Sequence, residues 1–348
     1  MSSPGSDCTS RRARGYASGS QGRNMLEPGR HERMTSPRVD AQAPSSNASW
    51  LLDSDPSIRW QVLRDLTDAP AEIVAKERSR VATEGWGPRL LDQQRPDGQW
   101  GDGVAHPFWW TNMHTLLYLR DLGLDPASGR ARTAIALVRD KITWGPEFGN
   151  SAFFEGEVEP CINGRVVALG AYFGEMSARL VDRLLGEQLH DGGWNCEAER
   201  GSVRSSFHTT ICVLEGLLAF EKASGAAPGV THARTRGQEY LLERRLLRRL
   251  STGEVIDPRW TAFAFPPLWH YDVLRSLDYL RSAGVTPDVR VEEAVAIVRE
   301  RRQGDGRWLL DVRHKDTLYE DLAGAVGEPN RWVTLRARRV LDWYARQD

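Results

Sequence analysis

The apolar residues of this chain are grouped in five segments with helical spacing. The segments cover residues 110–122, 161–173, 207–220, 268–280 and 331–344. In the third segment, four apolar residues recur at the three- to four-residue intervals of a helix face: Ile211, Leu214, Leu217 and Leu218. The pattern therefore predicts five inner helices.

More charged segments of similar length lie between the inner ones. They cover residues 130–141, 178–188, 233–247 and 291–302, and a further pair covers 57–66 and 71–81. A helix with one charged face packs its other face on the core. The chain thus predicts inner helices that alternate with outer ones.

Short loops rich in Gly, Asp and Trp punctuate this alternation. Three loops are alike, running from Gln94 to Trp100, Gln188 to Trp194 and Gln303 to Trp308, and weaker versions contain Trp144 and Trp260. The five tryptophans are 44, 50, 66 and 48 residues apart. Asp-Gly favours a turn, and Trp can pack that turn onto its neighbour. Repeats of this length are typical of arrays of helical hairpins.

We predict an all-α fold, a closed α/α toroid of helical hairpins in one domain over residues 47–348. An open solenoid would need polar capping repeats, and the sequence shows none. Residues 1–46 are rich in Ser, Gly, Pro and Arg. They are predicted to be a disordered tail, because they have too few large apolar residues to offset chain entropy.

Charge and cysteine usage narrow the function. The chain has 46 basic and 47 acidic residues, which argues against a nucleic-acid binder. No apolar run approaches the roughly 18 residues of a membrane span. The four cysteines are unevenly spaced and form no disulfide framework, so we expect a cytoplasmic protein.

The repeat loops resemble the QW repeats of squalene–hopene-type terpene cyclases. The stretch from Gly192 through Phe207, His208 and Thr209 is similar to the zinc-histidine region of protein prenyltransferase β subunits. Those subunits have an Asp-x-Cys pair about 50 residues upstream of the histidine. This chain has Glu159-Pro160-Cys161 in that place, and Cys161 precedes His208 by 47 residues. The resemblance covers roughly residues 85–345 and implies the toroid fold and a zinc site.

The sequence also departs from both families. Prenyltransferases hold a diphosphate with basic residues before the Asp-x-Cys pair, but residues 142–160 contain no Lys or Arg. The Asp-x-Asp-Asp acid motif of squalene-type cyclases is absent from the repeats, and there is room for one toroid where full-length cyclases have two. The resemblance therefore supports the fold of these families for this chain more strongly than it supports either activity.

The resemblance implies that Glu159, Cys161 and His208 bind Zn²⁺. Cys196 lies in the loop just before the helix that carries His208, and its position makes it a candidate for a further ligand. Thiolates, imidazoles and carboxylates are the usual ligands of zinc. Three protein ligands would leave an open position, and a fourth from Cys196 would close the site. The alternative is a small buried cysteine beside a hydrogen-bonded histidine.

A second group starts the next inner helix, where His270, Tyr271 and Asp272 follow two prolines. We predict these residues as catalytic, with Asp272 as general acid or base if an apolar cavity raises its pKa. The alternative for Asp272 is a helix cap.

Aromatic and polar residues cluster at the predicted starts of the inner helices. They form a predicted substrate pocket of Trp109, Trp110, His114, Asn163, Phe207, Trp269 and Trp332. Aromatic faces suit an isoprenoid ligand and stabilise cationic intermediates. The alternative is that they are core packing.

These observations predict a prenyltransferase- or terpene-cyclase-like enzyme that acts on a hydrophobic, isoprenoid-type small molecule with zinc at the toroid mouth. One alternative is a zinc-dependent hydrolase or lyase acting on a substrate without a diphosphate. The other is a non-catalytic, ligand-binding toroid. Prenyltransferase β subunits work with an α partner, but nothing in this sequence identifies a protein partner.

Overall fold

Helices account for the regular structure of the chain, as the apolar pattern predicts. The computed structural model describes residues 46–104 and 106–346, and within them β-pairing is limited to isolated bridges. The all-α prediction is confirmed. Residues 44–348 form one unit by their contacts, in line with a single domain. The predicted tail lies outside the described residues, except that Ser46 begins the first helix.

The inner helices match the predicted apolar segments. They are α5 (Phe108–Leu122), α7 (Pro160–Phe173), α9 (Phe207–Ser224), α11 (Val273–Ser282) and α14 (Arg331–Ala345). Helix α11 begins five residues later than predicted. The segment before it contains Pro266 and Pro267, and Leu268 has a φ of 49°. A left-handed residue cannot lie within a helix, and Asp272 caps the helix that follows, so residues 268–272 form a loop.

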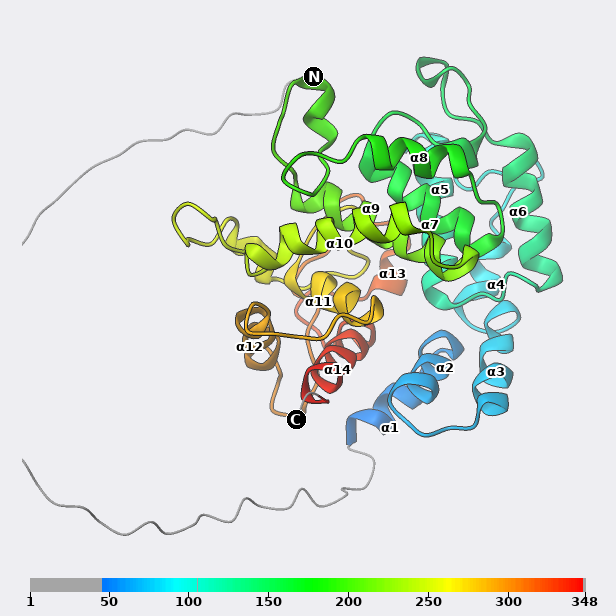
Figure 1. The fold of residues 1–348 in the computed structure, drawn as a ribbon. Helices are drawn as coiled ribbons and strands as arrows, with labels where there is room; N and C mark the ends of the chain where they lie inside the picture. The colour runs from blue at the N-terminus through cyan, green and yellow to red at the C-terminus, as the bar shows by residue number, and fades with distance from the viewer. Residues whose placement is uncertain (1–45, 105, 347–348) are drawn as a thin grey trace, which may run out of the picture. The chain divides into compact units, whose positions relative to one another are not determined.

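The outer helices are α6 (Gly129–Lys141), α8 (Ala178–Gly186), α10 (Pro228–Glu243) and α12 (Glu292–Glu300). Helix α8 packs on α7 and α10 packs on α9 (Figure 1). The remaining helices are α1 (Ser46–Leu52), α2 (Pro56–Asp65), α3 (Ala71–Ser79), α4 (Trp86–Leu91) and α13 (Glu320–Ala323). None of the described helices combines the length and hydrophobicity that crossing a bilayer would need.

Helices α7 and α9 lie side by side at very short range, because each has a glycine at the crossing (Figure 1). A Cβ atom on Gly164 would lie 2.6 Å from the Cys212 carbonyl oxygen, and one on Gly216 would lie 2.2 Å from the Gly164 carbonyl oxygen. Both distances are shorter than van der Waals contact. The glycines therefore allow a backbone contact that no larger residue permits.

The last helix contacts the first ones, as a closed array requires. In α14, the Arg339 guanidinium donates to the Gln61 side-chain oxygen at 2.8 Å and pairs with Asp65, both in α2. Arg331 donates to the Asp53 carbonyl oxygen at 3.0 Å. An open solenoid has no such contacts between its ends.

The three strong loops have the same hydrogen bonds. The indole N–H groups of Trp100, Trp194 and Trp308 each donate, at 2.7 Å, to the carbonyl oxygen ten residues earlier. The backbone N–H of each tryptophan donates to a side chain in the next inner helix: Asn112, Thr210 and Thr334. Each loop therefore joins the end of one helix to the start of another, which fixes where the inner helices begin.

Candidate metal centre and interior cavities

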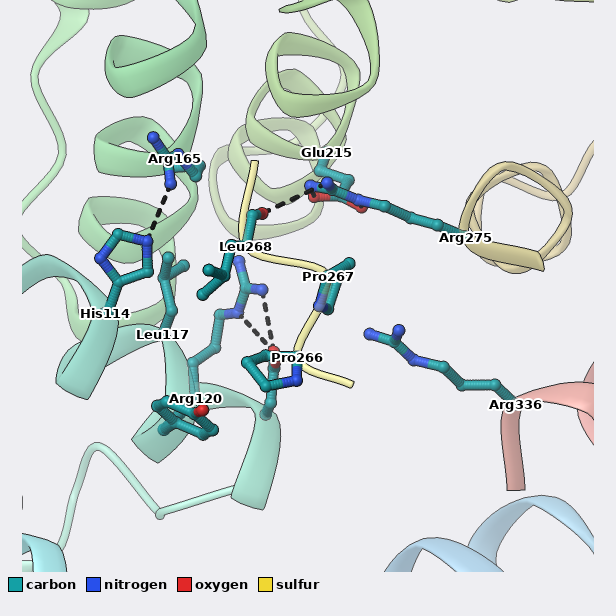
Figure 2. Close-up of a pocket in the computed structure, with 12 residues that line it drawn as sticks. His114, Leu117, Arg120, Arg165, Glu215, Pro266, Pro267, Leu268, Arg275 and Arg336 are labelled. Carbon is teal, nitrogen blue, oxygen red and sulfur yellow. Dashed lines mark hydrogen bonds and ion pairs between the residues drawn. The ribbon is translucent and has the colours of Figure 1, made fainter. Parts of the chain in front are cut away.

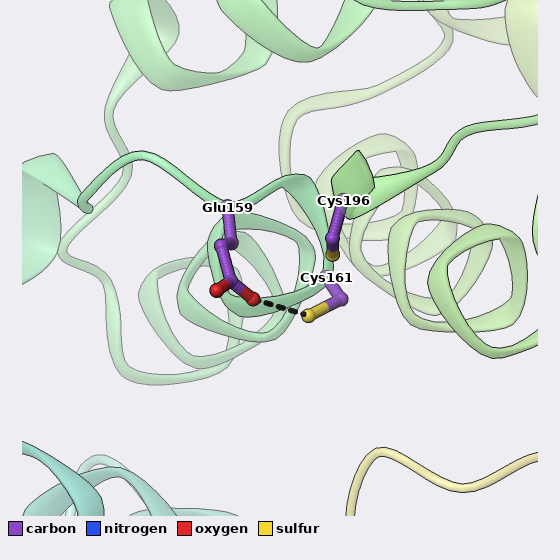
Figure 3. A group of neighbouring side chains, drawn as sticks. All are labelled: Glu159, Cys161 and Cys196. Carbon is purple, nitrogen blue, oxygen red and sulfur yellow. Dashed lines mark hydrogen bonds between the residues drawn. The ribbon is translucent and has the colours of Figure 1, made fainter. Parts of the chain in front are cut away.

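A carboxylate and two thiols meet at the N-terminal end of α7. The ligand atoms of Glu159, Cys161 and Cys196 all lie within 4.8 Å of one another (Figure 3). Glu159 directly precedes α7 and is exposed, whereas Cys161 is in its first turn and is 8% exposed. Cys196 begins the 3₁₀ helix η4 (Cys196–Arg200), just after the Trp194 loop. Cys161 and Cys196, which are 35 positions apart in the sequence, are thus brought together by the packing of α7 and α9.

Hydrogen bonds from the same elements hold this group in place. The Asn163 amide receives the Glu157 N–H and donates to the Glu157 carbonyl oxygen, both at 2.9 Å. The Glu159 N–H donates to the Glu157 carboxylate at 2.8 Å. The Thr209 hydroxyl donates to the Cys196 sulfur at 3.3 Å. Asn163, predicted to line a substrate pocket, is instead fully buried and fixes the turn before α7.

The two cysteines have opposite pKa shifts. A hydrogen bond between their sulfurs, followed by burial, raises the pKa of Cys161, and the same hydrogen bond lowers the pKa of Cys196. The Cys161 thiol also donates to the Glu159 carboxylate at 3.6 Å. Cys196 is therefore the sulfur that ionises first, and thiolates are the form in which cysteine binds metals.

The donor set fits a zinc ion. Zinc prefers thiolate and carboxylate ligands in a tetrahedron, and zinc–sulfur bonds of about 2.3 Å place two ligands about 4 Å apart. The three ligand atoms are already within 4.8 Å. Small side-chain rotations would complete the geometry.

His208 does not belong to this group, unlike the sequence prediction. Its Nδ1 atom accepts the backbone N–H of Tyr271 at 2.8 Å, and its ring packs edge-on against Trp269 and His270. In a neutral imidazole the proton is then on Nε2, whereas zinc-binding histidines usually donate from their second nitrogen. Burial lowers the pKa of His208 to about 4. Within the described residues, three of the four predicted ligands lie together, Glu159, Cys161 and Cys196, and His208 lies outside the group.

Asp272 acts as the helix cap that we considered as its alternative role. Its carboxylate accepts the Arg275 N–H at 2.8 Å at the start of α11. Burial raises its pKa to about 6. The neighbouring Tyr271 hydroxyl donates to the Leu246 carbonyl oxygen at 2.6 Å, and burial raises its pKa as well. Both polar groups are therefore engaged in holding the 268–272 loop.

His270 lies in a stack of rings beside this cap. Its ring centroid is 3.9 Å from that of Trp269 and 3.7 Å from that of His314. Burial, and then the proximity of His314, lowers the pKa of His270 to about 3, and burial lowers that of His314 to about 4. These imidazoles are consequently neutral at pH 7. His314 is a member of the cluster that the sequence pattern missed, because it lies in an irregular loop.

The predicted aromatic pocket is largely aromatic packing. Trp109 contacts Trp110 and Trp144, with both ring centroids at 5.6 Å. The ring of Trp110 lies 3.9 Å from that of His114. These side chains are in contact with one another at the start of α5, which matches the core-packing alternative.

The other predicted pocket aromatics pack in the same way. Phe207 lies 4.6 Å from Trp260, and Trp332 stacks on Phe265 at 4.6 Å with an interplanar angle of 8°. Phe207 also lines an open groove, and Trp332 lines a cavity discussed below. The predicted cluster is thus divided among several packing layers and does not line one shared pocket.

The inner helices enclose a small cavity lined by charged side chains (Figure 2). Its volume is about 40 Å³. Arg275, 4% exposed, makes a two-bond ion pair with Glu215 at 2.7 and 2.8 Å. The Arg165 guanidinium contacts His114 Nε2 at 3.1 Å and donates to the Cys161 carbonyl oxygen at 3.2 Å. Arg165 therefore links the metal-ligand helix to the cavity.

These charged residues had a signal in the sequence. Arg120, Arg165, Glu215 and Arg275 are charged residues inside segments that are otherwise apolar. Buried charges are rare unless they are paired, so such interruptions indicate an interior ionic network. The pattern does not tell which of them pair.

Comparisons with known proteins give a likeness of fold at low identity. No protein-family model matches the chain, and no curated protein matches it. Several solved structures of the type II terpene cyclase MstE from Scytonema are similar to it. A variant in complex with geranylgeranyl dihydroxybenzoate is 18% identical, with 83% of this chain and 86% of that chain covered and a TM-score of 0.40. The apo enzyme is also 18% identical, with 82% and 86% covered and a TM-score of 0.39.

Proposed function

We propose that Glu159, Cys161 and Cys196 bind Zn²⁺ and that the chain is a zinc-dependent enzyme. The observation that supports the site is the convergence of two thiols and a carboxylate within 4.8 Å. Three ligands of this kind leave one position of a tetrahedral ion open, which is the arrangement of catalytic zinc sites. The exposed Glu159 places this group at the surface, where a substrate can reach it.

Zinc bound here would supply a Lewis acid that activates a water or thiol nucleophile. The residues of the chain prepare the site for it. The lowered pKa of Cys196 favours the thiolate, and Thr209 holds its sulfur in place. Arg165 fixes the first turn of α7 through the Cys161 carbonyl oxygen. The site is therefore preorganised by residues at the starts of α7 and α9.

The substrate class follows from the sequence resemblance to terpene cyclases and prenyltransferases. We propose that the substrate is a hydrophobic, isoprenoid-type small molecule.

A zinc-dependent hydrolase or lyase is the second candidate. The observation that favours it is the charged lining of the interior cavity, where Arg165, Arg275 and Glu215 replace the expected aromatic wall. At about 40 Å³ this cavity is too small for a hydrocarbon chain, and its charged lining disfavours one.

The first experiment measures metal in protein purified without a histidine tag. We expect about one zinc per chain by mass spectrometry in the wild type and little in Cys161→Ala. The matched control is Cys212→Ala, which removes a buried thiol outside the group. A metal-free wild type, or unchanged zinc in Cys161→Ala, would refute the site.

The second experiment tests the substrate class. The zinc-loaded protein is incubated with prenyl diphosphates and with prenylated aromatic acids, and products are identified by mass spectrometry. Turnover that disappears in Cys161→Ala supports the isoprenoid proposal. Zinc binding without turnover of any prenyl compound favours the hydrolase or lyase.

A further inference from the structure

A second cavity lies toward the opposite end of α7 from the metal-ligand group. Its volume is about 360 Å³, and Tyr172, near the C-terminal end of α7, lines it. Tyr172 comes eleven positions after Cys161, which corresponds to about 16 Å along a helix. The cavity is lined by five arginines: Arg64, Arg78, Arg120, Arg336 and Arg339. It is thus separate from the metal centre.

Carboxylates do not balance this positive charge. Two aspartates line the cavity, Asp121 and Asp278, and Asp65 beside it pairs with Arg64 at 2.6 Å. Asp121 pairs with Arg120 at 2.8 Å, and Asp278 pairs with Arg281 at 2.9 Å. Arg336 reaches Asp278 only at 4.0 Å. Figure 2 shows its side chain extending from α14 into the interior.

Arg339 carries the clearest sign of a missing partner. It is 8% exposed, and its Nη2 atom donates to Gln61 and pairs with Asp65. Its Nε–H group is buried and has no hydrogen-bond partner among the described residues. Buried donors are normally satisfied, so this nitrogen needs an explanation, and a ligand in the adjacent cavity would supply one. Burial lowers the pKa of Arg339 to about 10, as expected for a cation with too little countercharge.

Not all of the cavity arginines donate to carbonyl groups at helix ends. The C-terminal carbonyl groups of α5 already receive hydrogen bonds from Trp60, which donates to Leu122, and from Gln61, which donates to Asp121. Arg78 donates to the Gly123 carbonyl oxygen and to the Tyr172 hydroxyl. None of these contacts uses Arg336 or the Nε of Arg339.

We infer that this cavity binds a phosphate or diphosphate group. Arginine side chains bind phosphate oxygens with paired, charge-assisted hydrogen bonds, and a dianion would supply the negative charge that the aspartates do not. The ring of Phe265, 5.7 Å from the Arg336 guanidinium, gives the cavity one apolar wall. This inference does not depend on zinc.

The test is calorimetric titration of the full chain with inorganic diphosphate and with inorganic phosphate. The protein is treated with a chelator, and Cys161→Ala is titrated in parallel so that binding at the metal centre is excluded. We expect saturable binding in both. Arg336→Gln should weaken it about ten- to a hundredfold, the usual effect of a lost charge-assisted contact, and Arg336→Lys should weaken it less.

Two further variants make the result decisive. Asp121→Asn removes a competing carboxylate from the cavity wall and should tighten binding. Arg139→Gln removes an exposed arginine of α6 that pairs with Asp140, and should leave binding unchanged. The inference is overturned if neither anion binds, if Arg336→Gln binds as the wild type does, or if binding disappears in Cys161→Ala. Thermal unfolding of each variant confirms that it is folded.

Discussion

The Nδ1 atom of His208 accepts the backbone N–H of Tyr271 at 2.8 Å. This hydrogen bond joins the start of α9 to the loop before α11. It also places the imidazole proton on Nε2, the atom with which a zinc-binding histidine at this position would have to coordinate. His208 therefore acts as a structural link between two helix starts, and Cys196 is the residue that completes the metal-ligand group.

Zinc content should depend on Cys196 and not on His208. We expect Cys196→Ser to lose most of the bound zinc, because it removes the sulfur whose lowered pKa favours the thiolate. His208→Gln should retain zinc, because its ring is held by Tyr271. The measurement is zinc per chain after gel filtration in a weak chelator. Loss of zinc from His208→Gln together with retention in Cys196→Ser would restore the original ligand assignment.

The inner helices could be predicted because their sequence signal is local. Helix α7 is buried along nearly its whole length, and its bounds match the apolar segment 161–173 to within one residue. Helix α11 was placed too early, since apolar residues also fill the loop before it. The start of α11 is set by the cap that Asp272 forms. From the sequence, this cap is predicted only as the alternative to a catalytic role for Asp272.

The site could be predicted only in part, because it depends on contacts between distant segments. The sequence predicts three members of the group, Glu159 and Cys161 by their spacing and Cys196 by its place in the loop before α9, but it also predicts His208, which lies outside the group. Whether Cys196 or His208 completes it depends on how a loop packs on a helix end, which spacing along the chain does not determine. The ion pair between Arg275 and Glu215 likewise joins residues 60 positions apart.

Trp194 should be a major source of stability. It is fully buried, its indole N–H donates to Leu184, and Gly237 leaves room for its ring, since a Cβ there would lie 2.9 Å from the indole. Trp194→Phe removes the hydrogen bond and leaves a cavity, which should cost about 2–3 kcal/mol. Urea unfolding measures this cost. The control is Trp86→Phe, at a half-buried tryptophan outside the repeat loops, which should change stability by less than about 1 kcal/mol. Equal losses of stability in Trp194→Phe and Trp86→Phe would contradict the structural role of the loop.

The Arg275–Glu215 pair should hold the loop before α11. Arg275 also donates to the His270 carbonyl oxygen at 2.7 Å and to that of Leu268 at 3.2 Å. Arg275→Met leaves Glu215 and two carbonyl groups unpaired, so we expect a loss of about 3–5 kcal/mol in the free energy of unfolding. Glu215→Gln retains an acceptor and should cost less. The control is Arg80→Met, at an exposed arginine that pairs with Glu84, and it should have little effect. A similar effect in the two arginine variants would show that the buried pair has no special role.

Acid should destabilise the protein through His270 and His314. Both have an ordinary pKa of 6.5, lowered by burial to about 3 and about 4. Below pH 6.5 the unfolded chain takes up protons that the folded chain does not, so stability is complete above pH 6.5 and is lost as the pH falls toward 4. Each histidine contributes at most about 1.4 kcal/mol per pH unit, and less with solvent screening of these half-buried rings.

The measurement is the urea midpoint of chelator-treated protein at a series of pH values between 7 and 4.5. His314→Asn should reduce the slope of stability against pH, and it should also ease protonation of His270, because it removes the neighbouring ring at 3.7 Å. His232→Asn, at an exposed histidine of α10, should leave the slope as it is. If His314→Asn left the slope unchanged as well, the imidazoles in this stack would be titrating as they do in water. Burial would then not be holding them neutral below pH 6.5.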